Sequence, residues 1–472
     1  MRDAVALPEL AEQGAAIHLV GIGGAGMAGL ALLLQARGAQ VSGCDHDSNE
    51  TTHDLERRGM KILRGHDPEH VQAANAVVHT AAVPGDHPEL EAARTLGLPV
   101  LKRSQALADL VNTGMLIAVG GTHGKTTTTA LAALALESAG LDPTALVGGR
   151  VPGWGGNARI GAARTYVVEA DEYDRSFLAL RPQHAVITSV EAEHLDTYGS
   201  FEEMEAAFDT FVDRVPEDGR VIACVDDDGV RRRLDVAGDR ALAYGLGREA
   251  ALRAESIAHE PDRTTFSARW REQSLGDFEL ALRGQHNVRN ALAVLGVMLA
   301  LGLEPHTARP ALAAFTGVER RFQVLGDAGG VTVVDDYAHH PTEVLATLDT
   351  ARQAFGSRRL VIAFQPHLYS RTRAFAREFG AALVGADVVF VTGIYPAREA
   401  PIPGVSATLV VDAARQAGEA KRVRHVEDLK DLLDALRGEL RDGDVFMTLG
   451  AGDIDSVAHA LLSELGRSHV DA

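Results

Sequence analysis

A glycine-rich loop at residues 121–126 contains the residues with the clearest chemical potential: it reads Gly-Thr-His-Gly-Lys-Thr. It lies between an apolar segment at 115–119, which we expect to be a strand, and an expected helix at 126–139. Backbone N–H groups at such a turn bind phosphate oxygens, Lys125 can reach the β- and γ-phosphates, and the Thr126 hydroxyl can ligate Mg²⁺. We therefore predict an ATP site with Mg²⁺, made by Gly121, Thr122, His123, Gly124, Lys125, Thr126 and Thr127.

This loop is a shorter variant of the usual phosphate-binding motif, because Val119 stands where the strict pattern has its first glycine. A plain strand–helix turn with an exposed lysine is the alternative interpretation. Four successive threonines at 126–129 are poor helix formers, so helix stability alone does not explain them. The strand–loop–helix context favours a nucleotide site.

Acidic residues and a histidine follow two further expected strands. Glu169 comes directly after the strand expected at 166–168, and His194 lies shortly after the one expected at 185–189. Side chains just past the carboxyl ends of strands face the crevice where α/β sheets bind ligands. Position therefore makes Glu169 a candidate Mg²⁺ ligand and His194 a candidate ligand for a second metal. A solvated acidic loop and a structural histidine are the alternatives.

A second glycine-rich loop stands near the N-terminus, where residues 21–26 read Gly-Ile-Gly-Gly-Ala-Gly. It follows an expected strand and opens an expected helix, and Asp45 ends the next expected strand. Glycines permit a tight turn and close approach to a diphosphate, which the start of a helix favours. The pattern fits NAD or another nucleotide diphosphate, or a turn without a ligand. The predicted substrate-binding residues here are Gly21, Gly23, Gly24, Gly26 and Asp45.

Composition limits the class of protein. The chain has 472 residues, which predicts two or three domains, and its net charge of −19 argues against a general nucleic-acid binder. Two cysteines, Cys44 and Cys224, offer neither a disulfide framework nor a zinc site and suit a reducing compartment. The first residues lack the layout of a signal peptide, and the most apolar run, 291–303, is too short to span a bilayer. We expect a cytoplasmic protein that binds neither nucleic acid nor membrane.

Alternating strands and helices predict an α/β fold with three domains. Residues 1–112 are expected to form a Rossmann-like domain that begins with a strand–loop–helix–strand unit at 17–45. Residues 113–317 are expected to form a P-loop-type ATPase domain. Its sheet should be mixed, because 240–280 alternates like antiparallel strands. Residues 318–472 are expected to form a C-terminal Rossmann-like domain.

These motifs together resemble those of the Mur ligase family, which shares its plan with folylpolyglutamate synthases. Besides the loop at 121–126, the resemblance is carried by 284–290 (Gly-Gln-His-Asn-Val-Arg-Asn), 335–341 (Asp-Asp-Tyr-Ala-His-His-Pro) and 364–372 (Phe-Gln-Pro-His-Leu-Tyr-Ser-Arg-Thr). Many relatives also have a modified lysine shortly after the histidine that matches His194. No lysine occurs between His194 and Arg220, as in the alanine-adding branch.

The resemblance implies a role for each matching residue. Glu169 and His194, with Thr126, would hold Mg²⁺ near the γ-phosphate, and Lys125, Glu169 and His194 would be catalytic. The remaining implied contacts are with the nucleotide, through His286, Asn290, Arg321 and Asp336, and with the other substrates, through Asn157, His339 and Arg371.

The activity implied by the resemblance is ATP-dependent joining of L-alanine to UDP-N-acetylmuramic acid through an acyl phosphate, in peptidoglycan precursor synthesis. The oligomeric state would be a monomer or homodimer. Three alternatives stay open. They are a ligase that recycles a tripeptide onto the same sugar nucleotide, an NAD-dependent oxidoreductase based on the loop at 21–26, and a catalytically silent nucleotide sensor.

Overall fold

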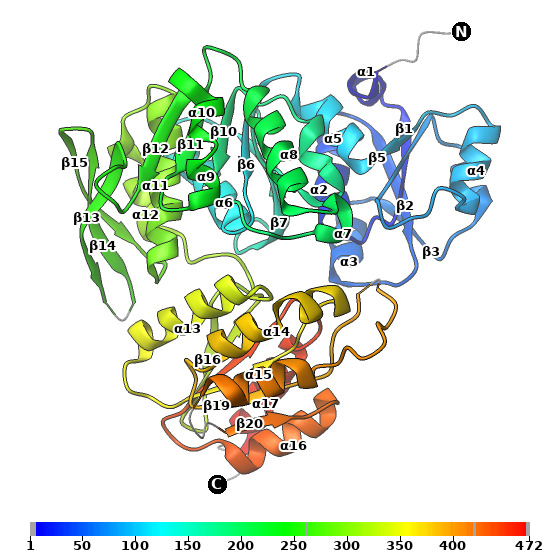
Figure 1. The fold of residues 1–472 in the computed structure, drawn as a ribbon. Helices are drawn as coiled ribbons and strands as arrows, with labels where there is room; N and C mark the ends of the chain where they lie inside the picture. The colour runs from blue at the N-terminus through cyan, green and yellow to red at the C-terminus, as the bar shows by residue number, and fades with distance from the viewer. Residues whose placement is uncertain (1–5, 261, 398, 419–421, 469–472) are drawn as a thin grey trace. The chain divides into compact units, whose positions relative to one another are not determined.

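The computed structural model describes residues 6–260, 262–397, 399–418 and 422–468. Three β-sheets, each flanked by helices, follow one another along the chain (Figure 1). The first two sheets belong to one compact unit. The third sheet belongs to a second unit, which is made of the chain from Glu319 onward and two short segments, Ala258–Thr264 and Leu282–His286. The predicted α/β class with three domains is therefore confirmed. No helix in the described part of the chain is long and apolar enough to cross a membrane.

The first sheet is fully parallel, with strand order β3-β2-β1-β4-β5. Its apolar strands are covered by helices on both faces, as parallel sheets require. The strands are β1 Ala16–Val20, β2 Gln40–Asp45, β3 Lys61–Arg64, β4 Ala76–His79 and β5 Val100–Lys102. The helices are α1 Leu7–Glu12, α2 Ala25–Ala36, α3 Glu50–Arg57, η1 Pro68–Val71, α4 Pro88–Thr95 and α5 Arg103–Val111.

The second sheet has ten strands in the order β15-β14-β13-β12-β11-β10-β6-β9-β7-β8 and is mixed, as predicted. Its strands are β6 Met115–Gly120, β7 Thr144–Val151, β8 Gly156–Arg159, β9 Thr165–Glu169, β10 His184–Ile187, β11 Arg220–Cys224, β12 Ala241–Gly245, β13 Leu252–His259, β14 Thr264–Trp270 and β15 Gln273–Leu280. Its helices are α6 Lys125–Ser138, η2 Tyr173–Ala179, α7 Leu195–Tyr198, α8 Phe201–Asp213, α9 Asp228–Arg231, α10 Leu234–Ala237, η3 Gly238–Arg240, α11 Gln285–Ala300, η4 Pro305–Ala308 and α12 Arg309–Ala314.

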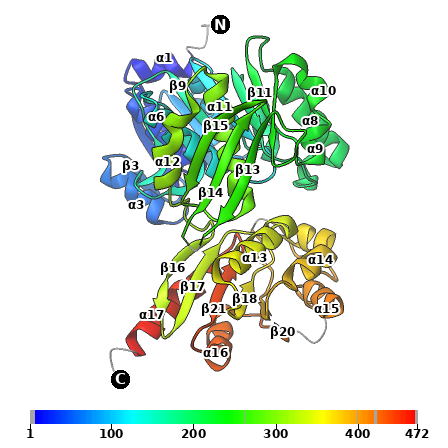
Figure 2. The same ribbon diagram turned by 90° about the vertical axis from the view of Figure 1, so that its left-hand side faces the viewer.

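One part of the expectation for residues 240–280 is wrong. β12 pairs in parallel with both β11 and β13, so the antiparallel part of the sheet does not begin at residue 240. The short connection between β14 and β15 allows only an antiparallel hairpin there. Figure 2 shows β13, β14 and β15 as long neighbouring strands. The alternation of apolar and polar residues does not show which strands pair in parallel. The connections between strands determine the pairing, and the sequence of one strand does not contain that information.

The third sheet has the order β16-β17-β21-β18-β19-β20 and is parallel except for β16, which pairs antiparallel with β17. Apolar clusters fill both of its faces. Its strands are β16 Gln323–Ala328, β17 Val331–Asp336, β18 Leu360–Phe364, β19 Val388–Val391, β20 Arg422–His425 and β21 Val445–Leu449. Its helices are α13 Pro341–Phe355, α14 Tyr369–Leu383, α15 Thr408–Ala417, α16 Leu429–Glu439 and α17 Asp455–Ser468.

Strand β6 and helix α6 form the rigid support for the loop at 121–124. Residues 116–119 of β6 are fully buried, and β6 lies between β10 and β9. Helix α6 is also buried along most of its length, including Thr128 and Thr129. The Thr129 hydroxyl donates to the Lys125 carbonyl oxygen at 2.8 Å, so it satisfies its own polar group inside the helix. The loop therefore joins two elements that cannot shift without disturbing the core.

Candidate active site

The loop at 121–124 has a backbone that requires glycine at two positions. Gly121 has φ of +128° and Gly124 has φ of +79°, both of which disfavour residues with a side chain. A Cβ atom at Gly121 would lie 2.2 Å from Thr188 Oγ1, and one at Gly124 would lie 2.7 Å from Asn290 Oδ1. The same contact brings Asn290, a predicted nucleotide-binding residue on α11, against the loop.

The segment that follows β10 holds this loop in place. Thr188 Oγ1 donates to the His123 carbonyl oxygen at 2.5 Å, and Ser189 Oγ accepts from the His123 N–H at 3.0 Å. Thr122 Oγ1 accepts from the Glu191 N–H at 2.9 Å. These bonds fix the loop backbone before any ligand arrives, which is the preorganisation that a phosphate site needs.

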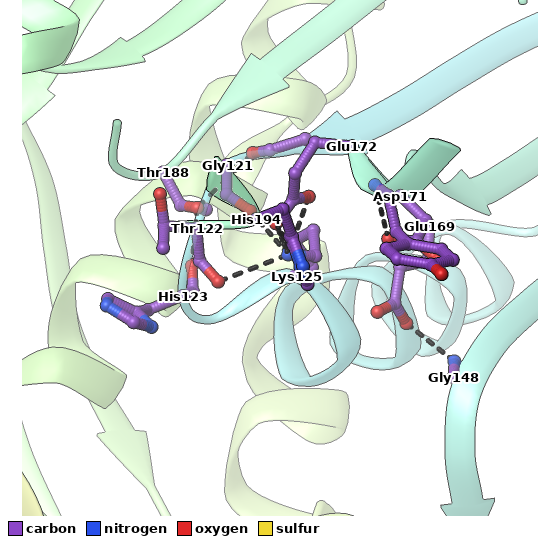
Figure 3. A network of polar contacts seen from close by, with 12 residues as sticks. Gly121, Thr122, His123, Lys125, Gly148, Glu169, Asp171, Glu172, Thr188 and His194 are labelled. Atoms are coloured by element: carbon purple, nitrogen blue, oxygen red, sulfur yellow. Dashed lines mark hydrogen bonds and ion pairs between the residues drawn. The ribbon is translucent and has the colours of Figure 1, made fainter. Parts of the chain in front are cut away.

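Lys125, the first residue of α6, is largely buried, with 13% of its side chain exposed, and its ammonium has three acceptors (Figure 3). Nζ donates to the Gly121 carbonyl oxygen at 2.6 Å and to the Thr122 carbonyl oxygen at 3.1 Å, and it lies 2.9–3.0 Å from the two Glu172 carboxylate oxygens. Burial acts to lower the pKa of Lys125, but Glu172 and the nearby carboxylates outweigh it and raise that pKa above its usual range. Lys125 is therefore a largely buried, paired cation beside the loop.

Glu172 is the principal charge partner of Lys125, a role that the sequence pattern did not predict. It is 1% exposed and lies just before η2. Burial raises the pKa of Glu172 to about 7, while Lys125 acts in the opposite direction. This role depends on the tertiary structure, because Glu172 meets Lys125 only when β9 and α6 lie side by side. The sequence alone does not give that distance.

Glu169 ends β9 and meets Thr126 at the start of α6. Thr126 Oγ1 donates to Glu169 Oε1 at 3.1 Å. The Gly148 N–H donates to Glu169 Oε2 at 2.6 Å (Figure 3). Burial raises the pKa of Glu169, opposed by Lys125. A hydroxyl and a carboxylate are ligands that suit Mg²⁺. The structure thus brings together two of the three predicted metal ligands.

His194, the third predicted metal ligand, belongs to a neighbouring group. Its Nε2 lies 3.8 Å from Glu172 Oε1, and its ring packs edge-on against Tyr173. His194, Glu172 and Glu193 offer ligand atoms that all lie within 4.8 Å of one another. Glu193 was not among the predicted ligands, although an acid adjacent to His194 just past a strand was a usable signal. Two ligand groups therefore flank Lys125, one with Thr126 and Glu169 and one with His194.

The first glycine loop is held by the end of β2. The Gly21 and Ile22 N–H groups donate to the Cys44 carbonyl oxygen at 2.9 and 3.1 Å, and the Gly23 N–H donates to Asp45 Oδ2 at 2.7 Å. Asp45 therefore orders the loop itself. Gly24 is the N-cap residue of α2, so the start of that helix follows the loop directly.

Arg103, at the start of α5, is a residue that the sequence analysis missed. A Cβ atom at Gly26 would lie 2.9 Å from Arg103 Nη1, so the guanidinium rests against the first glycine loop. Its Nη2 also lies 4.0 Å from Asp171 Oδ2. An arginine beside a glycine loop suits a diphosphate. No local motif marks Arg103, because it comes from a helix about 80 residues downstream of the loop.

Asn157 on β8 links the central sheet to the first glycine loop. Its Nδ2 donates to the Ala25 carbonyl oxygen at 2.6 Å and to the Val147 carbonyl oxygen at 3.0 Å. The side chain is 5% exposed. Asn157 thus lies at the loop where the sequence placed substrate contacts, and both of these hydrogen bonds are to backbone.

The second unit gathers its own set of predicted residues at the carboxyl ends of β17 and β18. Asp336 accepts N–H bonds from Phe322 and Ala338, each at 2.7 Å, and burial raises its pKa to about 6 against the effect of Arg321. The Arg321 guanidinium lies over the Tyr337 ring. Asp336 therefore orders the backbone around Arg321.

His339 and Arg371 meet through a third residue, His367. The His339 and His367 rings pack edge-on with centroids 5.6 Å apart, and Arg371 Nη1 lies 3.1 Å from His367 Nδ1. His339 is further held by the Tyr337 carbonyl oxygen, 2.9 Å from its Nδ1. The remaining predicted residue, His286, stands in the first turn of α11 beside Gly284.

Comparison with known proteins covers nearly the whole chain. Three family models match: "Mur ligase family, catalytic domain" over residues 16–114, "Mur ligase middle domain" over 119–298 and "Mur ligase, glutamate ligase domain" over 320–452. The chain belongs to the Mur ligase family. Membership implies an ATP-dependent ligase, which agrees with the phosphate loop at Lys125.

Individual relatives are similar over their full length. The UDP-N-acetylmuramate–L-alanine ligase of Myxococcus xanthus is 45% identical, covering 96% of this chain and 95% of the relative, and that of Salinibacter ruber is 43% identical over 95% and 94%. The crystal structure of the MurC ligase of Thermotoga maritima matches with a TM-score of 0.82 and 29% identity, covering 96% of this chain and all of that one. A murein peptide ligase of Psychrobacter arcticus gives a TM-score of 0.70 and 26% identity, with 96% and 99% covered.

We expect Gly121→Ala to weaken ATP binding by roughly tenfold or more, because strain of about 1–3 kcal/mol would distort the loop. Calorimetric titration with a non-hydrolysable ATP analogue measures this. The matched control is Gly140→Ala, just past the end of α6, where φ is +87° but a Cβ atom meets nothing within 4 Å. Unchanged ATP affinity in Gly121→Ala would contradict the assignment of this loop.

Proposed function

We propose that the chain forms an amide bond between L-alanine and the carboxylate of UDP-N-acetylmuramic acid, using ATP, in peptidoglycan precursor synthesis. The observation that carries the proposal is a largely buried, paired lysine at a glycine-rich loop, flanked by two groups of candidate metal ligands. This arrangement occurs in a chain that is 45% identical over 96% of its length to a relative named for that reaction. ATP use follows from the family, whereas Mg²⁺ and the two other substrates are part of the proposal.

The chemistry explains why such a site is needed. A carboxylate is a poor electrophile toward an amine at neutral pH. Transfer of the γ-phosphoryl group of ATP to that carboxylate gives an acyl phosphate and ADP. The neutral amine of alanine then attacks the acyl carbon, phosphate leaves, and one proton is lost to a base. Positioning and electrostatic stabilisation supply most of the rate enhancement in such a transfer.

Residues of the central domain carry the nucleotide in this proposal. Backbone N–H groups of residues 121–127 bind the phosphates, and Lys125 exchanges its carbonyl acceptors for phosphate oxygens. Thr126 and Glu169 would hold one Mg²⁺, and His194, with Glu172 and Glu193, a second. Both groups have the oxygen-rich donors that suit this ion, which would offset negative charge on the transferred phosphoryl group.

The other substrates follow from the remaining groups. The first glycine loop, with Gly21, Gly23, Gly24 and Gly26, would bind the UDP diphosphate, and Arg103 supplies a cation beside it. Asp45 and Asn157 keep the loop ordered. The second unit would add His339 and Arg371 for the amino acid. Its Arg321 and Asp336, with His286 and Asn290 of the 284–290 motif, would serve the nucleotide.

Three rival functions are less well supported. An oxidoreductase using the first glycine loop leaves the Lys125 site unexplained. A silent nucleotide sensor does not need Glu169 and His194. A tripeptide-recycling ligase is the nearest rival, but its solved relative has a lower TM-score, 0.70 against 0.82.

We also propose domain limits of 1–112, 113–317 and 318–472 and a monomeric or homodimeric state. The proposed location is the cytoplasm, where ATP and UDP-linked sugars occur.

Phosphate release from ATP and Mg²⁺ tests the proposed acceptor. With UDP-N-acetylmuramic acid present, we expect release to depend on L-alanine, because the acyl phosphate turns over only when an amine attacks it. Glycine, L-serine and the recycled tripeptide serve as competing acceptors. Release that needs the tripeptide instead would move the chain to the recycling branch, and NADH oxidation without phosphate release would favour the oxidoreductase.

The metal-ligand assignment predicts a change in Mg²⁺ requirement. We expect Glu169→Gln to raise the Mg²⁺ concentration for half-maximal activity by about tenfold or more, because it removes a charged ligand. Glu137→Gln, near the far end of α6, is the matched control, since Glu137 only pairs with Arg159 on the surface. An unchanged Mg²⁺ dependence in Glu169→Gln would show that Glu169 is not a ligand.

A further inference from the structure

A second cluster of potential metal ligands lies in the N-terminal domain, outside the proposed active site. Glu89 of α4 is fully buried at its centre. The Cys44 thiol lies 3.1 Å from Glu89 Oε2, and His70 Nδ1 lies 2.7 Å from Glu89 Oε1. His18, Cys44, His70 and Glu89 offer ligand atoms that all lie within 4.8 Å of one another. Sulfur, imidazole and carboxylate donors together are the ligand types of zinc.

His18 supplies the observation that distinguishes this cluster from an ordinary hydrogen-bond network. The residue is fully buried on β1, and its Nδ1 lies 3.0 Å from Ser42 Oγ. Its Nε2 has no hydrogen-bond partner among the described residues. Buried polar atoms are nearly always paired, so an unpaired imidazole nitrogen beside a thiol and a carboxylate needs an explanation. A metal ion bound to Nε2, with Nδ1 held by a neighbouring group, is the usual arrangement of a histidine ligand.

The distances suit a tetrahedral ion. Zn–N, Zn–O and Zn–S lengths of about 2.0–2.3 Å give ligand-to-ligand edges of about 3.3–3.6 Å. The separations in the cluster, from 2.7 Å to at most 4.8 Å, bracket these edges. Without an ion, the Cys44 thiol and His70 Nδ1 each hydrogen-bond to the Glu89 carboxylate.

The location also fits a structural metal. The four residues come from β1, β2, η1 and α4, so an ion would tie together four elements on one face of the first sheet. Among the described residues, partly buried side chains pack around the apolar cluster on that face, whose six buried members are Val20, Cys44, Val71, Val77, Leu90 and Ala93. An ion at this place would add a cross-link to this small apolar cluster.

We propose that His18, Cys44, His70 and Glu89 form a structural Zn²⁺ site. Binding replaces the S–H bond of Cys44 with a Zn–S bond and releases that proton to solvent. The His70 proton moves from Nδ1 to Nε2, and the two imidazoles and the carboxylate bind without further proton loss. His66 borders the site, with its Nδ1 3.4 Å from Cys44 Sγ and 3.5 Å from Glu89 Oε2, and His87 lies beside it. The cysteine count missed this site because three of its ligands are not cysteines and all four are distant in sequence.

The site would stiffen the first glycine loop. The Cys44 carbonyl oxygen accepts the N–H bonds of Gly21 and Ile22, so the residue that binds the ion also holds the loop. This consequence is independent of which nucleotide the loop binds, and the site itself stands apart from the proposed ligase activity.

Cobalt substitution in the full chain tests the proposal, because a Co²⁺ ion bound to thiolate shows a charge-transfer band. We titrate the chelator-treated, reduced protein with Co²⁺ and then displace it with Zn²⁺. We expect one equivalent of Co²⁺ to give the band and Zn²⁺ to abolish it. The Thr126–Glu169 and His194 groups contain no thiol and cannot produce it. A folded wild-type chain without the band would overturn the proposal and leave a hydrogen-bonded network.

Variants assign the ligands. The chain has two cysteines, so Cys44→Ser should abolish the band while Cys224→Ser, a buried thiol of the central sheet, keeps it. His70→Gln should weaken Co²⁺ binding by about tenfold or more. If the Cys44→Ser chain fails to fold, the His70→Gln variant decides the test instead. A band that survives in Cys44→Ser, or an unchanged affinity in His70→Gln, would refute the four-ligand site.

Discussion

The ion pair between the largely buried ammonium of Lys125 and Glu172 is the interaction on which the site depends. A charge removed from water at the end of β6 is strongly destabilising unless it is paired, and removing one partner of such a pair costs about 3–5 kcal/mol. The chain provides the Gly121 and Thr122 carbonyl oxygens and Glu172 as partners. Meeting this requirement positions the acidic segments after β9 and β10 around the start of α6, where the N–H groups of a helix end favour an anion. The need to pair Lys125 thus places a cation, a phosphate-binding loop and two groups of candidate metal ligands together at the start of α6.

The two glycine-rich loops have the same strand–loop–helix arrangement, but different residues hold each loop in place. Each joins a buried parallel strand to a helix, and each is held by groups from a neighbouring strand. In the first loop the support is the Cys44 carbonyl oxygen and the Asp45 carboxylate. In the second it is the segment from Thr188 to Glu191. The first loop gains an arginine and the second a lysine with acids, which suits one to a bound diphosphate and the other to phosphoryl transfer.

Local sequence predicted the features that depend on neighbouring residues. The strand–loop–helix around Lys125, the position of Glu169 at the carboxyl end of β9 and the α/β class follow from periodicity and glycine placement. Features that depend on distant segments were missed: Glu172 as the partner of Lys125, Arg103 against Gly26, and the parallel pairing of β12. Each requires two elements to meet through the fold. The cluster around Glu89 is the clearest example, since its four residues span 72 positions of the chain and match no spacing rule.

Replacing Lys125 tests the central claim most directly. In Lys125→Ala, we expect formation of the amide product from UDP-N-acetylmuramic acid, L-alanine and ATP to fall by about 10²-fold or more, because charge stabilisation of the transferred phosphoryl group is lost. Binding of the UDP-sugar, measured by calorimetry on the same protein, should stay unchanged, and Lys430→Ala on the exposed face of α16 is the control. Near-normal product formation by a folded Lys125→Ala chain would contradict the account.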